Sequence, residues 1–207
     1  MVLTDKQIRN YTVDYKREKL DLRLIENFKE ENLQSESYDV TIGNHIAVFK
    51  KETKCIDLYE QEVIDSLYTR INISQTGGYI LAPNEYILVS LQERINLPNF
   101  LTAHIRPRTK YTRLGLLVSD QHCNSTYSGN LQIGLHNVSN NSIKIEPGIR
   151  VAQIVFEELK GKPSDEKLYK NKANASYQNE ETFIGARFTA EYEKKINDII
   201  DIILEKD

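Results

Sequence analysis

The spacing of short β-rich runs most constrains what this chain of 207 residues can fold into. From Tyr38 to Leu159, runs rich in β-branched and aromatic residues alternate with turn residues such as Pro98-Asn99 and Pro147-Gly148. The predicted strands are Asp39–Gly43, His45–Phe49, Ile56–Tyr59, Tyr79–Leu81, Tyr86–Leu91, Thr102–Ile105, Gly115–Val118, Asn130–Asn137, Ile143–Ile145 and Val151–Leu159. About ten short strands at this spacing predict a mainly β fold, an antiparallel barrel or double-sheet roll.

Helices are expected at the two ends of the chain. Thr4-Asp5-Lys6-Gln7 has the spacing of a capping box, which predicts a short N-terminal helix from Asp5 to about Asn10. Apolar side chains at helical spacing between Thr189 and Lys206 predict an amphipathic C-terminal helix, which we expect to lie on its own barrel. Residues 60–72 are expected to form an insertion or a loop with a helical turn, and residues 160–176, polar and lysine-rich, a linker or mobile arm.

The composition and charge of the chain limit the classes of function that it can have. A hydrophobic content of 40% allows one substantial core, so one domain is the first expectation and two remain possible. A net charge of −3 argues against broad nucleic-acid or anionic-membrane binding, so an anion site must be local. Cys55 and Cys123 form no metal or disulfide pattern, and no apolar run approaches the roughly 20 residues that cross a bilayer. We therefore expect a soluble cytoplasmic protein.

One segment, Arg106 to Gln153, concentrates the chemistry. Cationic and hydroxyl side chains gather at its start, a turn containing Gly129 follows, and a β-patterned stretch then runs to Asn137. Phosphate oxygens bind forked or point cations and hydroxyl donors, so this composition suits a polyphosphate beside a flat ring.

The residues of this segment resemble the fold family shared by dCTP deaminases and trimeric dUTPases. Arg108-Thr109-Lys110-Tyr111-Thr112-Arg113-Leu114-Gly115 is similar to the deaminase phosphate segment. Tyr127-x-Gly129 through Asn137 resembles the nucleotide-binding hairpin, and Glu146 to Gln153 resembles the turn and strand that follow it. Leu3–Ile8, Gln34–Gly43, and Tyr177-Gln178 with Arg187 resemble the deaminase branch in particular.

The resemblance implies a dUTPase-like distorted antiparallel β-barrel or jelly roll, with short N-terminal and C-terminal helices. It divides the chain into a β domain (1–160), a mobile tail over the nucleotide site (161–188) and the amphipathic helix (189–207). It also implies a homotrimer whose sites form between neighbouring subunits, a deoxypyrimidine nucleoside triphosphate as ligand, and Mg²⁺ carried by the triphosphate. It predicts no metal ligands in the protein.

The same resemblance assigns binding roles to individual residues. The expected phosphate-binding residues are Arg108, Thr109, Lys110, Gln153, Tyr177 and Gln178. The expected sugar- or base-binding residues are Tyr127, Asn124 and Arg113. A ring at Tyr127 would leave no room for a 2′-hydroxyl and so favour deoxynucleotides. The alternatives are a core tyrosine at 127, a buried structural arginine at 113 and a solvated basic turn at 108–110.

The catalytic positions depart from the family. Deaminases of this family place a glutamate seven residues after the aromatic residue, and that position here is Gly134. Gln132 and His136 share its face of the strand, although His136 would be displaced by about 7 Å. The dUTPase aspartate, three residues before the aromatic, is replaced by Asn124, and an amide cannot accept a proton from water at neutral pH. Because the stretch from Gly115 to Tyr127 is two residues shorter than expected, a local realignment could bring Asp120 or His122 into the site.

Three functions therefore remain open. The first is hydrolytic deamination of dCTP to dUTP and ammonia, with Asp120 and Arg113 as candidate catalytic residues. The second is a catalytically degenerate dCTP- or dUTP-binding relative that acts as a sensor, a sequestering protein or a regulator. The third is a structural trimer with a vestigial pocket. The choice between enzyme and non-enzyme, the preference between cytosine and uracil, and feedback regulation stay open at this point.

Overall fold

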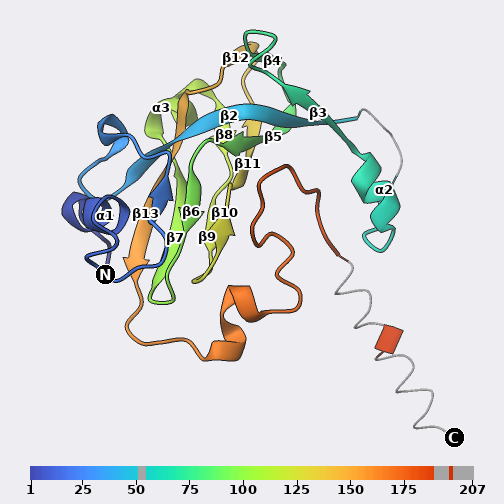
Figure 1. Ribbon diagram of the computed structural model, residues 1–207. Coiled ribbons are helices and arrows are strands. Elements are labelled where there is room, and N and C mark those ends of the chain that lie inside the picture. The colour runs from blue at the N-terminus through green and yellow to red at the C-terminus, as the bar shows by residue number, and fades with distance from the viewer. Residues whose placement is uncertain (51–54, 189–195, 198–207) are drawn as a thin grey trace, which may run out of the picture.

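The computed structural model describes residues 1–50, 55–188 and 196–197. Within these residues the chain is mainly β, with three short α-helices (Figure 1). The helices are α1 (Asp5–Thr12), α2 (Gln61–Ser66) and α3 (Thr109–Leu114). The strands are β1 (Ile25–Glu26), β2 (Tyr38–Phe49), β3 (Tyr68–Asn72), β4 (Tyr79–Leu81), β5 (Tyr86–Leu91), β6 (Arg94–Asn96), β7 (Leu101–Pro107), β8 (Leu116–Val118), β9 (Gln121–Cys123), β10 (Ser128–Gly129), β11 (Gln132–Asn137), β12 (Ile143–Ile145) and β13 (Arg150–Glu158).

The largest sheet is antiparallel and has the order β8-β11-β5-β2-β13-β7-β9, with β3 also paired to β2. Strand β2 joins its two halves, because its first residues pair with β13 and its later ones with β5 and β3. The β2–β5 register shifts between Ile42 and Ile46, and the β2–β13 register shifts between Arg150 and Ala152. Such irregularities bend strands, and the sheet curls around one apolar core (Figure 1). The predicted antiparallel β fold is confirmed.

Alternation along β5, β7 and the later part of β13 places their apolar side chains in that core. In β7, Leu101, Ala103 and Ile105 are fully buried, whereas the residues between them are partly exposed. In β11, Ile133 and Leu135 face the core, so the intervening positions lie on the other face of the sheet. The polar residues on that other face are the ones available for a site.

Several local expectations are corrected. The two runs at Asp39–Gly43 and His45–Phe49 form the single strand β2, and Ile56–Tyr59 is not a strand. There the Tyr59 N–H donates to Asp57 Oδ1 at 2.9 Å, a side-chain turn that replaces strand pairing. The expected insertion at 60–72 contains α2 and β3, two regular elements.

The helix starts follow the capping expectation. Thr4 N–H donates to Gln7 Oε1 at 3.0 Å, and α1 continues to Thr12 rather than ending near Asn10. The segment predicted to bind phosphate is not a simple turn, because Thr109–Leu114 forms α3. Gly115 ends this helix with φ +81°, a left-handed conformation that favours glycine.

Beyond β13 the chain forms a tail, residues 161–188, that folds back along the barrel (Figure 1). It contains the 3₁₀ turns η2 (Asp165–Lys167) and η3 (Tyr169–Asn171). The tail meets β10 through a parallel bridge between Gly129 and Glu180, and Asn130 N–H donates to Glu180 O at 2.7 Å. The helix expected over 189–207 lies outside the described residues, except for 196–197.

Candidate functional site

A cavity of about 560 Å³ is lined by residues of the tail and of strands β9 and β11. Four tyrosines line it, two from the barrel side and two from the tail: Tyr68, Tyr127, Tyr169 and Tyr177. Its volume is in the range of small-molecule sites, and aromatic walls around a few polar groups are typical of pockets for flat rings.

Tyr127, the predicted sugar-contacting residue, lines this cavity and is only 5% exposed. Its ring lies 5.9 Å from that of Tyr169, and burial raises the pKa of its hydroxyl well above the usual range. A Cβ atom at Gly129 would come within 2.6 Å of this hydroxyl, so the glycine permits the ring's position. Tyr127 therefore forms one wall of the cavity, and its close neighbours limit the movement of its ring.

The other residues predicted near the sugar and base fall in different places. Asn124 lines the cavity, together with Gln132 and His122. Arg113 lies in the last turn of α3 with an exposed side chain, outside the cavity lining. The alternative of a buried structural arginine is therefore wrong.

Neither Asp120, the candidate replacement, nor Gly134, the position where the family has its glutamate, supplies a carboxylate to the cavity. Asp120 is exposed and pairs with Arg106 at 2.9 Å, outside the cavity lining. At Gly134 the neighbouring strand covers the free space, because a Cβ atom there would lie 2.7 Å from ring atoms of Tyr86. Tyr86 occupies the room that a side chain at Gly134 would need. His136 lies beside Tyr86, at 6.4 Å between ring centroids, and is also absent from the lining.

One carboxyl does reach the cavity, and the sequence patterns gave no sign of it. Glu180, on the tail, lines the cavity and is 4% exposed. Burial raises its pKa to about 7, although a hydrogen bond from Ile184 N–H to Oε1, at 3.1 Å, acts in the opposite direction. The adjacent Glu181 is exposed and pairs with Arg94 at 3.5 Å. In the sequence these two glutamates are equivalent, since only the folded tail distinguishes them.

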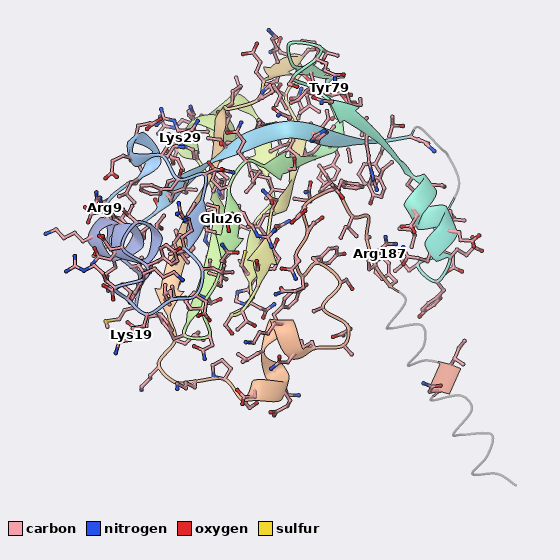
Figure 2. The ribbon with its side chains drawn as sticks, viewed as in Figure 1. Arg9, Lys19, Glu26, Lys29, Tyr79 and Arg187 are labelled. Carbon is pink, nitrogen blue, oxygen red and sulfur yellow. The ribbon has the colours of Figure 1, made fainter. Side chains whose placement is uncertain are left out.

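The tail is held to the barrel by specific polar contacts. Gln178 accepts from Ser128 N–H at 3.2 Å and donates to Thr126 O at 3.1 Å. Arg187, which is labelled in Figure 2, donates from Nη1 to both carboxylate oxygens of Asp65 in α2, at 2.6 and 2.8 Å. Gln178, a predicted phosphate ligand, thus has its amide engaged in holding the tail, whereas Tyr177 faces the cavity.

A separate cationic corner forms where α3 meets β2 and β13. Asp39, 1% exposed, pairs with Arg108 at 3.1 Å and lies 3.9 Å from Arg150. Arg108 and Tyr111 both donate to the Arg150 carbonyl, at 3.0 and 2.9 Å. Desolvation and the neighbouring positive charges of Arg108 and Arg150 lower the pKa of Lys110. Three cations thus surround one carboxylate, and the corner carries an excess of positive charge.

The remaining predicted phosphate residues border this corner. Thr109 is the first residue of α3 and is exposed, and Gln153 of β13 lies opposite Asp39 of β2 in the strand register. Neither Arg108, Thr109, Lys110 nor Gln153 lines the cavity of the same chain. The predicted site residues therefore form two groups, a cationic corner and an aromatic cavity. Asp39 and Arg150 were not among the predicted site residues, although an aspartate at the start of an apolar run was a usable signal.

Neither group resembles a metal centre. Across residues 1–50 and 55–188, the structure contains no cluster of three or more histidine, cysteine or acidic side chains able to hold an ion. The corner offers cations, whereas Mg²⁺ binds oxygen ligands and commonly enters a site with substrate phosphates. No helix within the described part of the chain is long and apolar enough to cross a membrane.

The chain is similar in sequence to a known protein family. The sequence profile of the dCTP deaminase-like family matches residues 2–159. A dCTP deaminase (dUMP-forming) of Sulfurihydrogenibium sp. is 30% identical over 173 residues, covering 83% of this chain and 91% of the relative. One from Hydrogenobaculum sp., with the same name, is 33% identical over 165 residues, covering 79% and 86%.

Among solved structures, the 2′-deoxycytidine 5′-triphosphate deaminase of Agrobacterium tumefaciens is similar in fold, with a TM-score of 0.59 at 18% identity. The match covers 75% of this chain and 46% of that one, so the matched part corresponds to about half the length of that protein. At this identity the likeness concerns the fold alone.

Proposed function

Because this chain belongs to the dCTP deaminase-like family, we propose that it binds deoxypyrimidine nucleoside triphosphates, dCTP among them. The observation that carries this proposal is the charge excess at the corner, where Arg108, Lys110 and Arg150 surround the single carboxylate of Asp39. A triphosphate neutralises such an excess. Lys110 supplies a point charge to the phosphate oxygens, and Arg108, whose terminal nitrogens contact Asp39 and the Arg150 carbonyl, adds positive charge beside it.

The sugar and the base of the nucleotide bind in the cavity. Tyr127, fixed between Tyr169 and the backbone at Gly129, forms a wall against the 2′ position of the sugar. Rejection of a ribonucleotide then arises from steric exclusion, which needs a wall that cannot retreat. Asn124 and Gln132 offer amide groups to the base edge.

The two groups act together only across subunits. The corner residues do not line the cavity of their own chain, so one bound triphosphate would contact the corner of one subunit and the cavity of another. We propose a homotrimer with this arrangement, as the family resemblance implies. Mg²⁺ would accompany the triphosphate rather than occupy a protein site, since the corner itself is cationic.

A second candidate function, deamination of dCTP, is supported by Glu180, a carboxyl that lines the cavity. Its product here would be dUTP, even though the relatives are named dUMP-forming. Release of pyrophosphate needs a group that accepts a proton from the water that attacks the α-phosphorus, and Asn124, at the position of the dUTPase aspartate, provides only an amide.

Titration calorimetry with dCTP, dUTP and CTP tests the binding proposal. Lys110→Ala should weaken dCTP binding about tenfold or more, the usual loss for a charge-assisted contact. Lys144→Ala, on β12 and paired with Glu146, is the matched control and should bind as the unaltered protein does. Equal affinities for dCTP in the Lys110→Ala and Lys144→Ala proteins, or no binding of any triphosphate, would overturn the proposal. Light scattering with and without dCTP measures the subunit number.

A further inference from the structure

We propose that Glu180 is the proton-transfer residue of this site, carrying protons between water and the cytosine ring of bound dCTP. The inference rests on the proposed function, because it requires dCTP in the cavity. It assigns to the tail a role that the family places at the strand position occupied here by Gly134.

The position of Glu180 is set by the barrel. Its carbonyl accepts from Asn130 N–H at 2.7 Å, and Gly129 bridges to it directly. Asn179 N–H donates to Ser128 O at 2.7 Å, one residue earlier in both segments. These contacts attach the tail backbone to the segment that leads into β11, and the carboxyl itself accepts from Ile184 N–H at 3.1 Å. A group that transfers protons needs such positioning.

The surroundings of Glu180 suit a residue that transfers protons. It is the only acidic side chain, among the residues that the structure describes, that lines the cavity. Tyr127 and Tyr169 are close enough for its charge to raise the pKa of both hydroxyls, and Arg94 is paired with Glu181 instead. No cation of residues 1–50 or 55–188 forms an ion pair with Glu180, so burial dominates and its pKa rises to about 7. A general base or acid works best when its pKa lies near the operating pH.

The reaction balances with one carboxylate and one water. The water oxygen forms a bond to C4 of cytosine while ionised Glu180 takes a proton from the water and gives it to N3. Glu180 then takes the proton of the new C4 hydroxyl and gives it to the exocyclic amino group. The C4–N4 bond breaks, ammonia leaves, and the ring keeps a C4 carbonyl and a proton on N3. Glu180 ends ionised, as it began.

Other groups are less suited to this chemistry. Asp120 is paired with Arg106 outside the cavity, and the space at Gly134 is covered by Tyr86. His122 lines the cavity but is exposed, and its ring lies 4.9 Å from that of His104 on the outer face of the sheet. Among the residues that the structure describes, Glu180 alone combines a carboxyl, burial and contact with the cavity.

The test compares Glu180→Gln with Glu181→Gln in the full-length protein. For each, dCTP binding is measured by calorimetry and ammonia release by a coupled assay. Glu180→Gln should bind dCTP with little change but lose about 10²–10⁴-fold in kcat, the range for loss of a general base. Glu181→Gln should retain its rate to within about twofold, as for an ordinary surface change.

The outcomes separate this inference from the proposed function. If the unaltered protein binds dCTP and releases no ammonia, or if Glu180→Gln turns over at the unaltered rate, the role of Glu180 is refuted and nucleotide binding stands. If no triphosphate binds, both are refuted. Should Glu180→Gln fail to fold, the pH profile of the unaltered protein decides. A base at Glu180 requires kcat/KM to rise with pH through about 7, and a flat profile there would refute it.

Discussion

Replacing Glu180 by glutamine should change how the stability of the protein depends on pH. The folded protein raises the pKa of this carboxyl from 4.5 to about 7, and the chief cause is burial. Between these two values the folded state keeps a proton that the unfolded state has lost. Stability must therefore fall as pH rises from about 4.5 to about 7, and Glu180 contributes no further change above that.

The size of this effect follows from the same pKa values. Each pH unit between 4.5 and about 7 corresponds to about 1.4 kcal/mol, which gives a loss of about 3 kcal/mol. Because Glu180 is 4% exposed, solvent screening reduces this figure little. If the tail leaves the barrel while the core remains folded, the loss is limited to the free energy that holds the tail in place.

Urea unfolding at pH 4.5, 6 and 8 measures the effect, with Glu180→Gln compared to the unaltered protein at each pH. The glutamine keeps an oxygen that can accept from Ile184 N–H, and it cannot ionise. The difference in free energy of unfolding should shift in favour of the variant by up to about 3 kcal/mol between pH 4.5 and 8. Limited proteolysis of residues 161–188 over the same range shows whether the tail alone is released. A difference that stays constant with pH, together with an unchanged rate of tail cleavage, would refute the reasoning.

Three further changes test other contacts. Gly134→Glu should destabilise the fold by about 1–3 kcal/mol in urea unfolding, because the new side chain meets Tyr86, and the double variant Gly134→Glu/Tyr86→Ala should recover most of that loss. If the hairpin is in the family register, ammonia release should increase in the double variant only. Arg187→Ala removes the contact with Asp65, so proteolytic cleavage of the tail should accelerate about fivefold, equivalent to about 1 kcal/mol. Asp39→Asn leaves the corner cations without their carboxylate; we expect lower stability in urea unfolding and tighter pyrophosphate binding by calorimetry.

Sequence patterns predicted the barrel well because its determinants are local. Alternating apolar residues predicted Tyr86–Leu91 as a strand with the observed bounds, and the spacing of Thr4 and Gln7 predicted the start of α1. The prediction of a strand at Ile56–Tyr59 was wrong. Its apolar residues satisfy the strand pattern, but Asp57 stabilises a turn. A pattern of residue types does not show when a side chain, rather than a neighbouring strand, accepts the hydrogen bond of a backbone N–H.

The site was harder to predict because its key features depend on distant parts of the chain. The missing carboxylate at Gly134 was visible in the sequence, but its cover by Tyr86 depends on how β5 and β11 pair. The burial of Glu180 depends on a tail whose polar composition suggests a mobile arm. Its special environment arises from contacts to Gly129 and Asn130, about fifty residues earlier.

The long-range attachment of the tail also has a consequence for the order of folding. Arg187 reaches Asp65 across 122 residues, and Gln61 donates to the carbonyl of Ala186 across 125. Both partners belong to α2, which must be in place before these contacts can form. Contacts of such sequence separation form slowly, because a long loop must close first. The aromatic cavity is therefore completed late, when the last described part of the chain settles on a barrel that is already assembled.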